Sequence, residues 1–218
     1  MNILLGFDPG GTGKGSGEFG WCVAEHQREL PLRIRRTGRA KHAEQAVTDA
    51  LREVAPSDLV IAAGIDAPLF WSPVGDREAD KMIRAEFKAM GVCSSSVLSV
   101  NSLQGACLIQ GIMAAILLRT RFPELLLSES HPKAFLLMAH HAFCSAQPIE
   151  AKLCELTDWL GRNHKDVTEH ERDAALATVS AWAMYECRQD WTDLYSLEKQ
   201  PLSPIESPLG YWMPMLLA

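Results

Sequence analysis

Apolar and polar residues follow one another along the chain in patterns that predict an α/β fold. Two apolar runs, residues 4–8 and 19–24, flank a glycine-rich turn, which is typical of a hairpin. Residues 32–37 alternate apolar and basic side chains, as a strand with one solvent-exposed face does. Residues 42–54 carry apolar side chains at helical spacing. Residues 58–68 (DLVIAAGIDAP) contain a continuous apolar run, which predicts a central strand covered on both faces.

The second half of the chain is mostly helical. A short apolar run at residues 123–130 predicts a strand that ends near Glu129, and Pro132 suits the first position of the next helix. Thr168 is followed three residues later by Glu171, which predicts a capping box at the start of the last long helix. We also expect helices at residues 76–90, 102–121 and 149–161, and a short last strand at residues 211–213.

These elements predict one α/β domain over residues 1–218, because this length is long for one domain and short for two. Its core is a mixed sheet of about five strands, the first three antiparallel, flanked by helices. We expect a helical insertion around residues 76–121 and an extended tail at residues 200–218, where prolines recur.

Composition favours a cytoplasmic protein. The six cysteines are scattered without a paired motif, as reduced, buried thiols are. The most apolar stretch, residues 105–118, is shorter than the roughly 20 residues that cross a membrane, so we expect no membrane association. The net charge of −6 gives no overall attraction for nucleic acid. The basic stretch at residues 28–42 favours a solvated edge strand, with a local nucleic-acid patch as the alternative. Nothing in the sequence indicates the oligomeric state.

The glycine-rich turn at residues 10–17 contains Gly13 and Lys14, the dipeptide of a phosphate-binding loop. That loop also needs a glycine where this chain has Asp8, a Ser or Thr where it has Gly15, and a helix afterwards. We therefore interpret the turn as a hairpin loop that leaves Asp8 at the end of a strand. Lys14 would at most contact the backbone of a substrate.

Three acidic residues, Asp8, Asp66 and Glu129, stand at the ends of predicted strands. Sites in open α/β sheets lie beyond the carboxyl ends of strands, so these acids can meet in one cleft. Asp173 lies in the second turn of the final helix, whose many alanines make it slim enough to approach Asp8. His170 lies three residues earlier, on the same face of that helix.

Clustered carboxylates repel one another and need a compensating cation. Oxygen ligands without cysteine or paired histidine favour Mg²⁺ or Mn²⁺. Two such ions about 4 Å apart are the usual arrangement for phosphodiester cleavage. Each acid alone has an ordinary role, as a turn residue or as a charge at a helix start. The four together favour a metal site.

Other side chains near these acids could take part, and each has a plainer role. His170 is a candidate general acid or water-orienting group, or else a surface residue of the first helical turn. His131 is a candidate for substrate contact, or else a helix cap before Pro132. Arg77 and Arg84 lie seven residues apart on one helical face and are candidates to contact phosphate. The arginines could instead pair with nearby acids, namely Asp76, Asp80 and Glu86.

Four blocks of the sequence are similar to those of a known family. GFDPG…FGWCVAE, GIDAPLFW…DREADKMIR, SESHPKAF and HERDAALATVSAWA resemble, in order, the blocks of the uncharacterised predicted-nuclease family with an RNase H-like fold. They span about residues 3–183. The resemblance implies a mixed five-stranded sheet with acids on the first strand, the fourth strand and the final helix. RuvC-type resolvases and RNase H place their metal-binding acids in a similar way.

That placement carries over to Asp8, Asp66 and Asp173 as metal ligands. Glu129 belongs to this family's own Glu-x-His-Pro block, and its role is open. RNase H takes its second acid from its first helix, where Glu44 and Glu53 are the substitutes in this chain.

The leading hypothesis is a divalent-metal-dependent nuclease that hydrolyses DNA or RNA, with nucleic acid as its partner. A nucleotide-binding domain of the actin-like type is an alternative, because DPGGTG matches the first phosphate loop of that class. That clamp needs two such domains, and the chain has room for one. A third hypothesis is a non-catalytic module that keeps the fold to bind a partner, which the acidic net charge favours.

Overall fold

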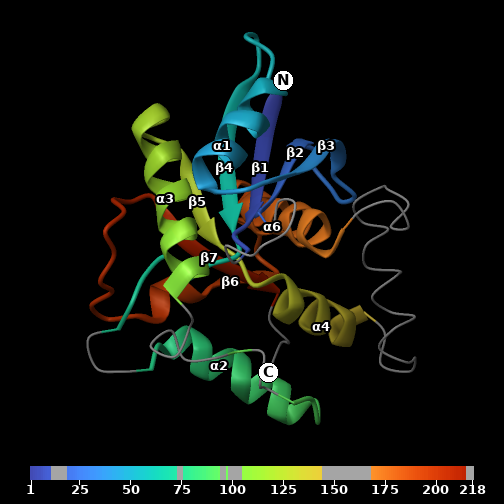
Figure 1. The fold of residues 1–218 in the computed structure, drawn as a ribbon. Coiled ribbons are helices and arrows are strands. Elements are labelled where there is room, and N and C mark those ends of the chain that lie inside the picture. The colour runs from blue at the N-terminus through green and yellow to red at the C-terminus, as the bar shows by residue number, and fades with distance from the viewer. Residues whose placement is uncertain (11–18, 73–75, 94–96, 98–104, 144–167, 215–218) are drawn as a thin grey trace.

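The protein is built around one seven-stranded sheet with the strand order β3-β2-β1-β4-β5-β7-β6 (Figure 1). The computed structural model describes residues 1–10, 19–72, 76–93, 97, 105–143 and 168–214. Residues 11–17 of the expected hairpin loop and the helix expected at residues 149–161 lie outside these ranges. The strands are β1 (Asn2–Asp8), β2 (Phe19–Glu25), β3 (Arg33–Ala40), β4 (Leu59–Ile65), β5 (Leu126–Glu129), β6 (Trp191–Asp193) and β7 (Leu209–Pro214).

The sheet is mixed, as the sequence predicts. Strands β1, β2 and β3 are antiparallel neighbours. Strand β4 runs parallel to β1, and β5 runs parallel to β4, so the first five strands have the RNase H-like arrangement. The expected number of about five strands is too low, because the C-terminal region adds two. Strand β7 pairs with β5 in parallel, and β6 pairs with β7 in antiparallel fashion.

The tail at residues 200–218, which is predicted to be extended, therefore contributes the buried strand β7. Leu209, Tyr211 and Met213 of β7 are buried, which explains why this segment joins the sheet although prolines surround it. The expected strand at residues 211–213 is confirmed and is longer than predicted.

Helices cover both faces of the sheet. Helix α6 lies on one face, and α3 lies on the other, where Gly111 packs against Ile65 and Ala67. Helix α1 packs beside α3, and α4 contacts both α6 and β7. None of the helices that the structure describes has the length and apolar character needed to cross a bilayer. The helices are α1 (Ala43–Arg52), α2 (Glu78–Ala89), α3 (Gly105–Arg121), α4 (Pro132–Phe143) and α6 (Glu169–Glu186), with a 3₁₀ turn at Leu194–Leu197.

Helix α6 lies unusually close to the sheet because three strands present glycine to it. A Cβ atom at Gly64 of β4 would lie 1.8 Å from the backbone oxygen of Ala177. The corresponding distances are 1.9 Å from Gly6 to Ala174 and 2.0 Å from Gly20 to His170. No side chain other than hydrogen fits these contacts. The small residues of the helix and the glycines of the strands together set the height of α6 above the sheet.

Candidate active site

Asp8 and Asp66 lie at the same edge of the sheet, at the ends of neighbouring parallel strands. Asp8 is the last residue of β1, and Asp66 follows directly after β4. The backbone amide of Asp66 donates to the carbonyl oxygen of Phe7 at 2.8 Å, so the pairing of β1 with β4 continues up to the acids. Asp8 is 8% exposed, and Asp66 keeps part of its surface exposed while its carboxyl group is withdrawn from bulk water. Parallel pairing thus brings the two carboxylates together at the carboxyl edge.

Asp173 reaches this edge from α6. The helix begins with the predicted capping box: Thr168 Oγ1 accepts from the amide of Glu171 at 3.3 Å, and the Glu171 carboxylate accepts from the amide of Thr168 at 3.1 Å. Asp173 is 3% exposed. Its Oδ1 accepts from Nε and Nη2 of Arg172 at 2.9 and 2.7 Å. A fixed helix start and the close glycine contacts therefore hold Asp173 near the strand ends.

His170 contacts Asp8 directly. Its Nδ1 lies 2.6 Å from Oδ2 of Asp8, and Gly20 makes room for the backbone at His170. The hydrogen bond and the negative charge of Asp8 raise the pKa of His170. The imidazole therefore carries a positive charge more readily than an isolated histidine does. The sequence predicts that His170 and Asp173 share one face of the helix. That face is turned toward the end of β1, where His170 meets Asp8.

The carboxylates at this edge have raised pKa values. Withdrawal from bulk water, followed by the charges of Asp8 and Asp173, raises the pKa of Asp66 well above its ordinary value. Burial raises the pKa of Asp173 to about 6, although Arg172 lowers it in part. Burial also raises the pKa of Asp8, against the lowering effect of His170. The local cations thus leave the negative charge only partly balanced.

Two cations near these acids were not expected from the sequence. Lys133 of α4 pairs with Glu169 at 3.1 Å, and its charge lowers the pKa values of Asp8 and Asp66. Arg172 is the second cation. Both lie close to residues that the sequence singles out, since Lys133 comes two positions after His131 and Arg172 directly precedes Asp173. A search for basic residues next to the acidic blocks would have found them.

The three carboxylates suit a hard divalent cation in their chemistry. All three are oxygen donors, and Asp8 and Asp173 raise the pKa of Asp66 through their charge. Within the described ranges, however, no three His, Cys, Asp or Glu side chains are arranged so that they could hold a metal ion as they stand. Asp8 is engaged by His170, and Asp173 by Arg172. Metal binding would require these two contacts to open.

Glu129 points away from this group. Strand β5 places Glu129 beside Ile65, and Ile65 faces α3 rather than α6. The neighbouring residue Ser130 faces α6 instead, where its hydroxyl lies 3.2 Å from that of Ser180. Glu129 is 2% exposed and is hydrogen-bonded to Arg77 and to the backbone of Leu69. Contrary to the sequence prediction, the end of β5 therefore does not bring Glu129 into one cleft with Asp8 and Asp66.

The two arginines named as phosphate contacts pair with acids of the protein. Arg77 is 2% exposed and binds Asp80 and Glu129. Arg84 binds Asp76 and donates to the carbonyl oxygen of Val97 at 3.2 Å. The plainer interpretation of both arginines thus matches the contacts in the structure.

The remaining candidates lie elsewhere or outside the described residues. His131 precedes α4, and its carbonyl oxygen accepts from the amide of Phe135 at 2.9 Å, as the residue that caps a helix does. Lys14 lies outside the described ranges. Glu44 is exposed on α1, and Glu53 follows the end of that helix, which packs with α3 on the face opposite α6. Neither glutamate substitutes for an acid of the group.

The basic stretch is an edge strand, and part of its charge is used internally. Arg33 and Arg35 pair with Glu25, and Arg35 also binds Asp58 at 2.7 Å. Arg36 and Arg39 are exposed, and Nε of Arg39 lies 3.9 Å from a carboxylate oxygen of Glu171. In the register of the sheet, Arg39 lies opposite Gly20, which itself lies opposite Asp8. Arg39 thus lies in the same row across the sheet as Asp8.

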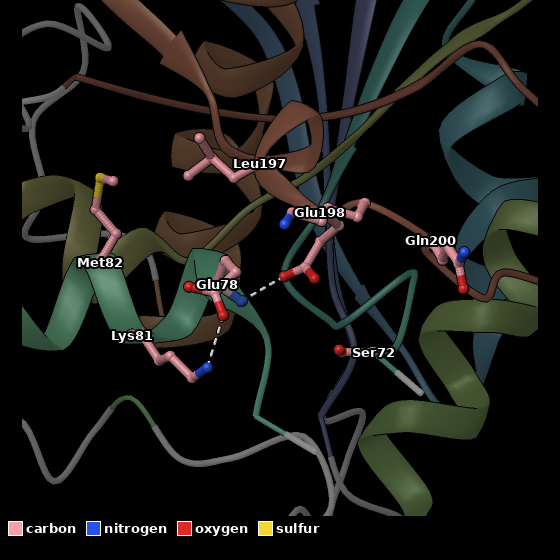
Figure 2. Close-up of a pocket in the computed structure, with 8 residues that line it drawn as sticks. Ser72, Glu78, Lys81, Met82, Leu197, Glu198 and Gln200 are labelled. Atoms are coloured by element: carbon pink, nitrogen blue, oxygen red, sulfur yellow. Dashed lines mark hydrogen bonds and ion pairs between the residues drawn. The ribbon is translucent and has the colours of Figure 1, made fainter. Parts of the chain in front are cut away.

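A pocket of about 890 Å³ lies apart from the acids, between the start of α2 and the segment after the 3₁₀ turn (Figure 2). Figure 2 shows Glu198 directed at the backbone amide of Glu78, with Lys81 paired to the Glu78 carboxylate at 2.6 Å. Neither Asp8, Asp66 nor Asp173 lines this pocket. Its lining is Ser72, Glu78, Lys81, Met82, Leu197, Glu198, Lys199 and Gln200.

Comparisons with known proteins give structural neighbours only. No protein-family model matches the sequence, and a search of curated proteins found no match. Among solved structures, Thermus thermophilus RuvC in complex with Holliday junction substrate is similar, with a TM-score of 0.46 and 13% identity over 84% of this chain and 94% of that chain. A second Thermus thermophilus RuvC structure has a TM-score of 0.43 and 13% identity over 84% and 95%. RuvC resolvases are thus structural neighbours of this chain.

Proposed function

We propose that this protein is a divalent-metal-dependent nuclease that hydrolyses phosphodiester bonds in DNA or RNA. Asp8, Asp66 and Asp173 would hold Mg²⁺ or Mn²⁺. The observation that carries the proposal is the gathering of these carboxylates at one sheet edge, where burial and then the neighbouring charges raise the pKa of Asp66. Such repulsion lowers the stability of the metal-free protein, and a bound cation relieves it.

The side chains around the acids take defined roles in this proposal. A bound divalent ion supplies charge stabilisation at the phosphoryl oxygens and a water molecule of lowered pKa. With Asp8 committed to the ion, His170 would lose its contact with that carboxylate, and its imidazole would be placed to act as a general acid or a general base. Arg172 would likewise be freed from Asp173 and, with Lys133, would contact the phosphate of the substrate.

Nucleic acid would approach across the β3 edge. Arg36 and Arg39 are exposed there, and Arg39 shares its row of the sheet with Asp8. This local positive charge offsets the overall net charge of −6. Lys14, which lies outside the described ranges, is proposed as a further contact with the substrate backbone.

Titration of Mn²⁺ into the purified protein, followed by calorimetry, tests the metal site. We expect binding by the wild type and none by the Asp8→Asn/Asp66→Asn double variant. Hydrolysis of labelled single-stranded DNA, duplex DNA, four-way DNA junctions and RNA, each with Mg²⁺ or with EDTA, then identifies the substrate. Lack of both metal binding and hydrolysis in the wild type would overturn the proposal.

One observation favours a second function, a non-catalytic module that binds nucleic acid. Asp8 and Asp173 already have cationic partners in His170 and Arg172, so the fold neutralises part of the group without a metal. Oligonucleotide binding that is unchanged by EDTA and by the double variant, without hydrolysis, is the result that favours it. Thermal stabilisation by ATP with Mg²⁺ but not by oligonucleotides would instead favour the nucleotide-binding class.

A further inference from the structure

A buried arginine forms the centre of a polar cluster behind the acids. Arg77 is 2% exposed, and all five of its N–H donors are used. Nε donates to Asp80 at 2.9 Å, and Nη2 donates to Asp80 and to Glu129 at 2.7 and 2.8 Å. Nη1 donates to Glu129 at 2.9 Å and to the carbonyl oxygen of Phe70 at 3.2 Å. The guanidinium also lies 4.5 Å from the centre of the Phe70 ring. Nothing remains on Arg77 for a substrate.

This cluster holds the backbone that follows Asp66. The carboxylate of Glu129 accepts from the amide of Leu69 at 2.9 Å, and Arg77 binds the carbonyl oxygen of the next residue, Phe70. The hydroxyl of Ser203 donates to the carbonyl oxygen of Leu69 at 2.7 Å. Three side chains from distant parts of the chain therefore bind the backbone of two consecutive residues, only three and four positions after Asp66.

Within the part of the chain that the structure describes, Asp66 has no comparable anchor of its own. It lies just beyond the last residue of β4, and its amide is bonded to Phe7 on the preceding side. The position of its carboxylate is therefore set by two supports, the β1–β4 pairing before it and the Leu69–Phe70 contacts after it. Metal ligands must be held to within about 0.5 Å of their working geometry.

We propose that Glu129 and Arg77 are positioning residues that fix the Asp66 carboxylate for metal binding, and that Glu129 is not itself a ligand. The inference rests on the proposed function, because it concerns the same metal. It assigns a role to the acid of the Glu-x-His-Pro block. Both Glu129 oxygens are bonded, Oε1 to Arg77 and Oε2 to Arg77 and Leu69, on the face of the sheet that α3 covers.

The two candidate roles of Glu129 predict opposite effects for a change at Arg77. If Glu129 were a ligand, weakening its contact with Arg77 would leave the metal affinity unchanged or raise it. If both residues hold the Leu69–Phe70 backbone, changes at either one weaken metal binding. Removal of a partner behind a metal ligand typically costs about 10-fold or more in affinity.

The test measures Mn²⁺ affinity by calorimetry for Glu129→Gln and Arg77→Lys. Gln keeps the size of Glu129 but offers an N–H₂ group to a donor, and Lys keeps the charge of Arg77 but loses its planar fork. We expect the Kd to rise about 10-fold in each. An unchanged or lower Kd for Arg77→Lys, or an unchanged Kd for Glu129→Gln, would overturn the inference.

Two matched controls separate positioning from general loss of stability. Tyr211→Phe changes the same cluster, because the ring of Tyr211 lies 5.9 Å from the Arg77 guanidinium, but the buried hydroxyl has no recorded partner among the described residues. Arg35→Met breaks an ion-pair cluster of similar kind that involves Asp58 and Glu25. We expect unchanged Mn²⁺ affinity in both.

Amide hydrogen exchange supplies a readout that needs no metal. In metal-free Glu129→Gln we expect faster exchange at Leu69 and Asp66, with little change in β2 and β3. If the wild type binds no Mn²⁺, the proposed function fails. Unchanged exchange at Leu69 in Glu129→Gln would separately show that Glu129 does not hold this backbone. If Glu129→Gln or Arg77→Lys does not fold, Ser203→Ala removes a single contact with Leu69 and takes its place in both measurements.

Discussion

Strand β4 has an aspartate at each end, and the two have opposite electrostatic environments. Asp58, just before β4, accepts hydrogen bonds from the amino group of Met1 at 2.9 Å, from Arg35 at 2.7 Å and from the amide of Ala55 at 3.0 Å. The bond to the Met1 amino group and the bond to Arg35 hold the pKa of Asp58 well below its usual value. Asp66, just after β4, has its pKa raised well above the usual value by burial and by neighbouring carboxylates.

The difference distinguishes acids that stabilise the fold, at the Asp58 end, from acids that do not stabilise it, at the Asp66 end. At the Asp58 end, cations neutralise each acid and the fold gains stability. At the Asp66 end, acids are gathered with incomplete compensation, which costs stability. Groups whose environment disfavours their own charge are typical of functional sites. The comparison therefore singles out one edge of the sheet without reference to any relative.

The largest expected effect is on activity. Asp66→Asn should lower the rate of metal-dependent hydrolysis by more than about 100-fold. This loss exceeds the roughly 10- to 100-fold that is typical when a hydrogen-bond partner of a metal ligand is removed, because Asp66 is itself a proposed ligand. Asp58→Asn, the same chemical change at the other end of β4, should leave the rate per folded molecule unchanged. Rates are measured at saturating Mg²⁺ on whichever nucleic acid is cleaved. Equal losses in the two variants would remove the distinction between the ends.

The next effect comes from the contact that brings α6 to the acids. Gly64→Ala should lower the free energy of unfolding by about 2 kcal/mol, because the new methyl group overlaps the backbone oxygen of Ala177 and must push the helix away. Urea unfolding measures the change. Gly91→Ala is the control, since no atom lies within 4 Å of that position and only its φ of 69° disfavours alanine. A smaller loss for Gly64→Ala than for Gly91→Ala would contradict the close packing.

A smaller effect concerns stability without metal. Asp66→Asn should raise the free energy of unfolding in EDTA by about 1 kcal/mol, or about 2–4 °C in Tm, because it removes one of several like charges. Asp58→Asn should lower the Tm instead, since it disrupts contacts with Arg35 and the Met1 amino group. Thermal unfolding in EDTA distinguishes the two signs. A lower Tm for Asp66→Asn would show that Asp66 also stabilises the fold.

The smallest effect is the pH dependence of the Asp58 contacts. The pKa of Asp58 is lower in the folded protein than in the unfolded chain, where it is close to 3.8. Its contribution to stability is therefore fully present above that value and is lost as the pH falls through the folded pKa. The difference in unfolding free energy between wild type and Asp58→Asn should be constant at neutral pH and should shrink below about pH 4. A difference that grows on acidification would contradict the lowered pKa.

Much of the fold could be predicted because the relevant signals are local. The apolar runs that became β1 and β4, the helical spacing of α1 and the capping box at Thr168 are properties of short segments. Placement of Asp8 and Asp66 follows from where those runs end. The two additional strands could not be counted in this way, because β6 has three residues and β7 lies among prolines. Their pairing depends on burial that the sequence does not display.

The finer arrangement of the site depends on direction and distance, which local patterns do not give. Strand β5 is buried on both faces, so nothing in its sequence indicates that Glu129 and Ser130 point to opposite sides of the sheet. Asp80 is three residues from Arg77, so this pairing can be predicted from the sequence, but the bond of Arg77 to Glu129 joins residues 52 positions apart. The glycines of β1, β2 and β4 acquire their meaning only when α6 lies on them.

Those three glycines also make it possible to find the site without a substrate. In a mutational scan selected only for folding, Gly6, Gly20 and Gly64 should accept no other residue, whereas Asp8, Asp66 and Asp173 should accept neutral replacements. A scan selected for the biological activity should reject changes at both sets. Subtraction of the first tolerance map from the second would leave the acids and remove the scaffold that carries them.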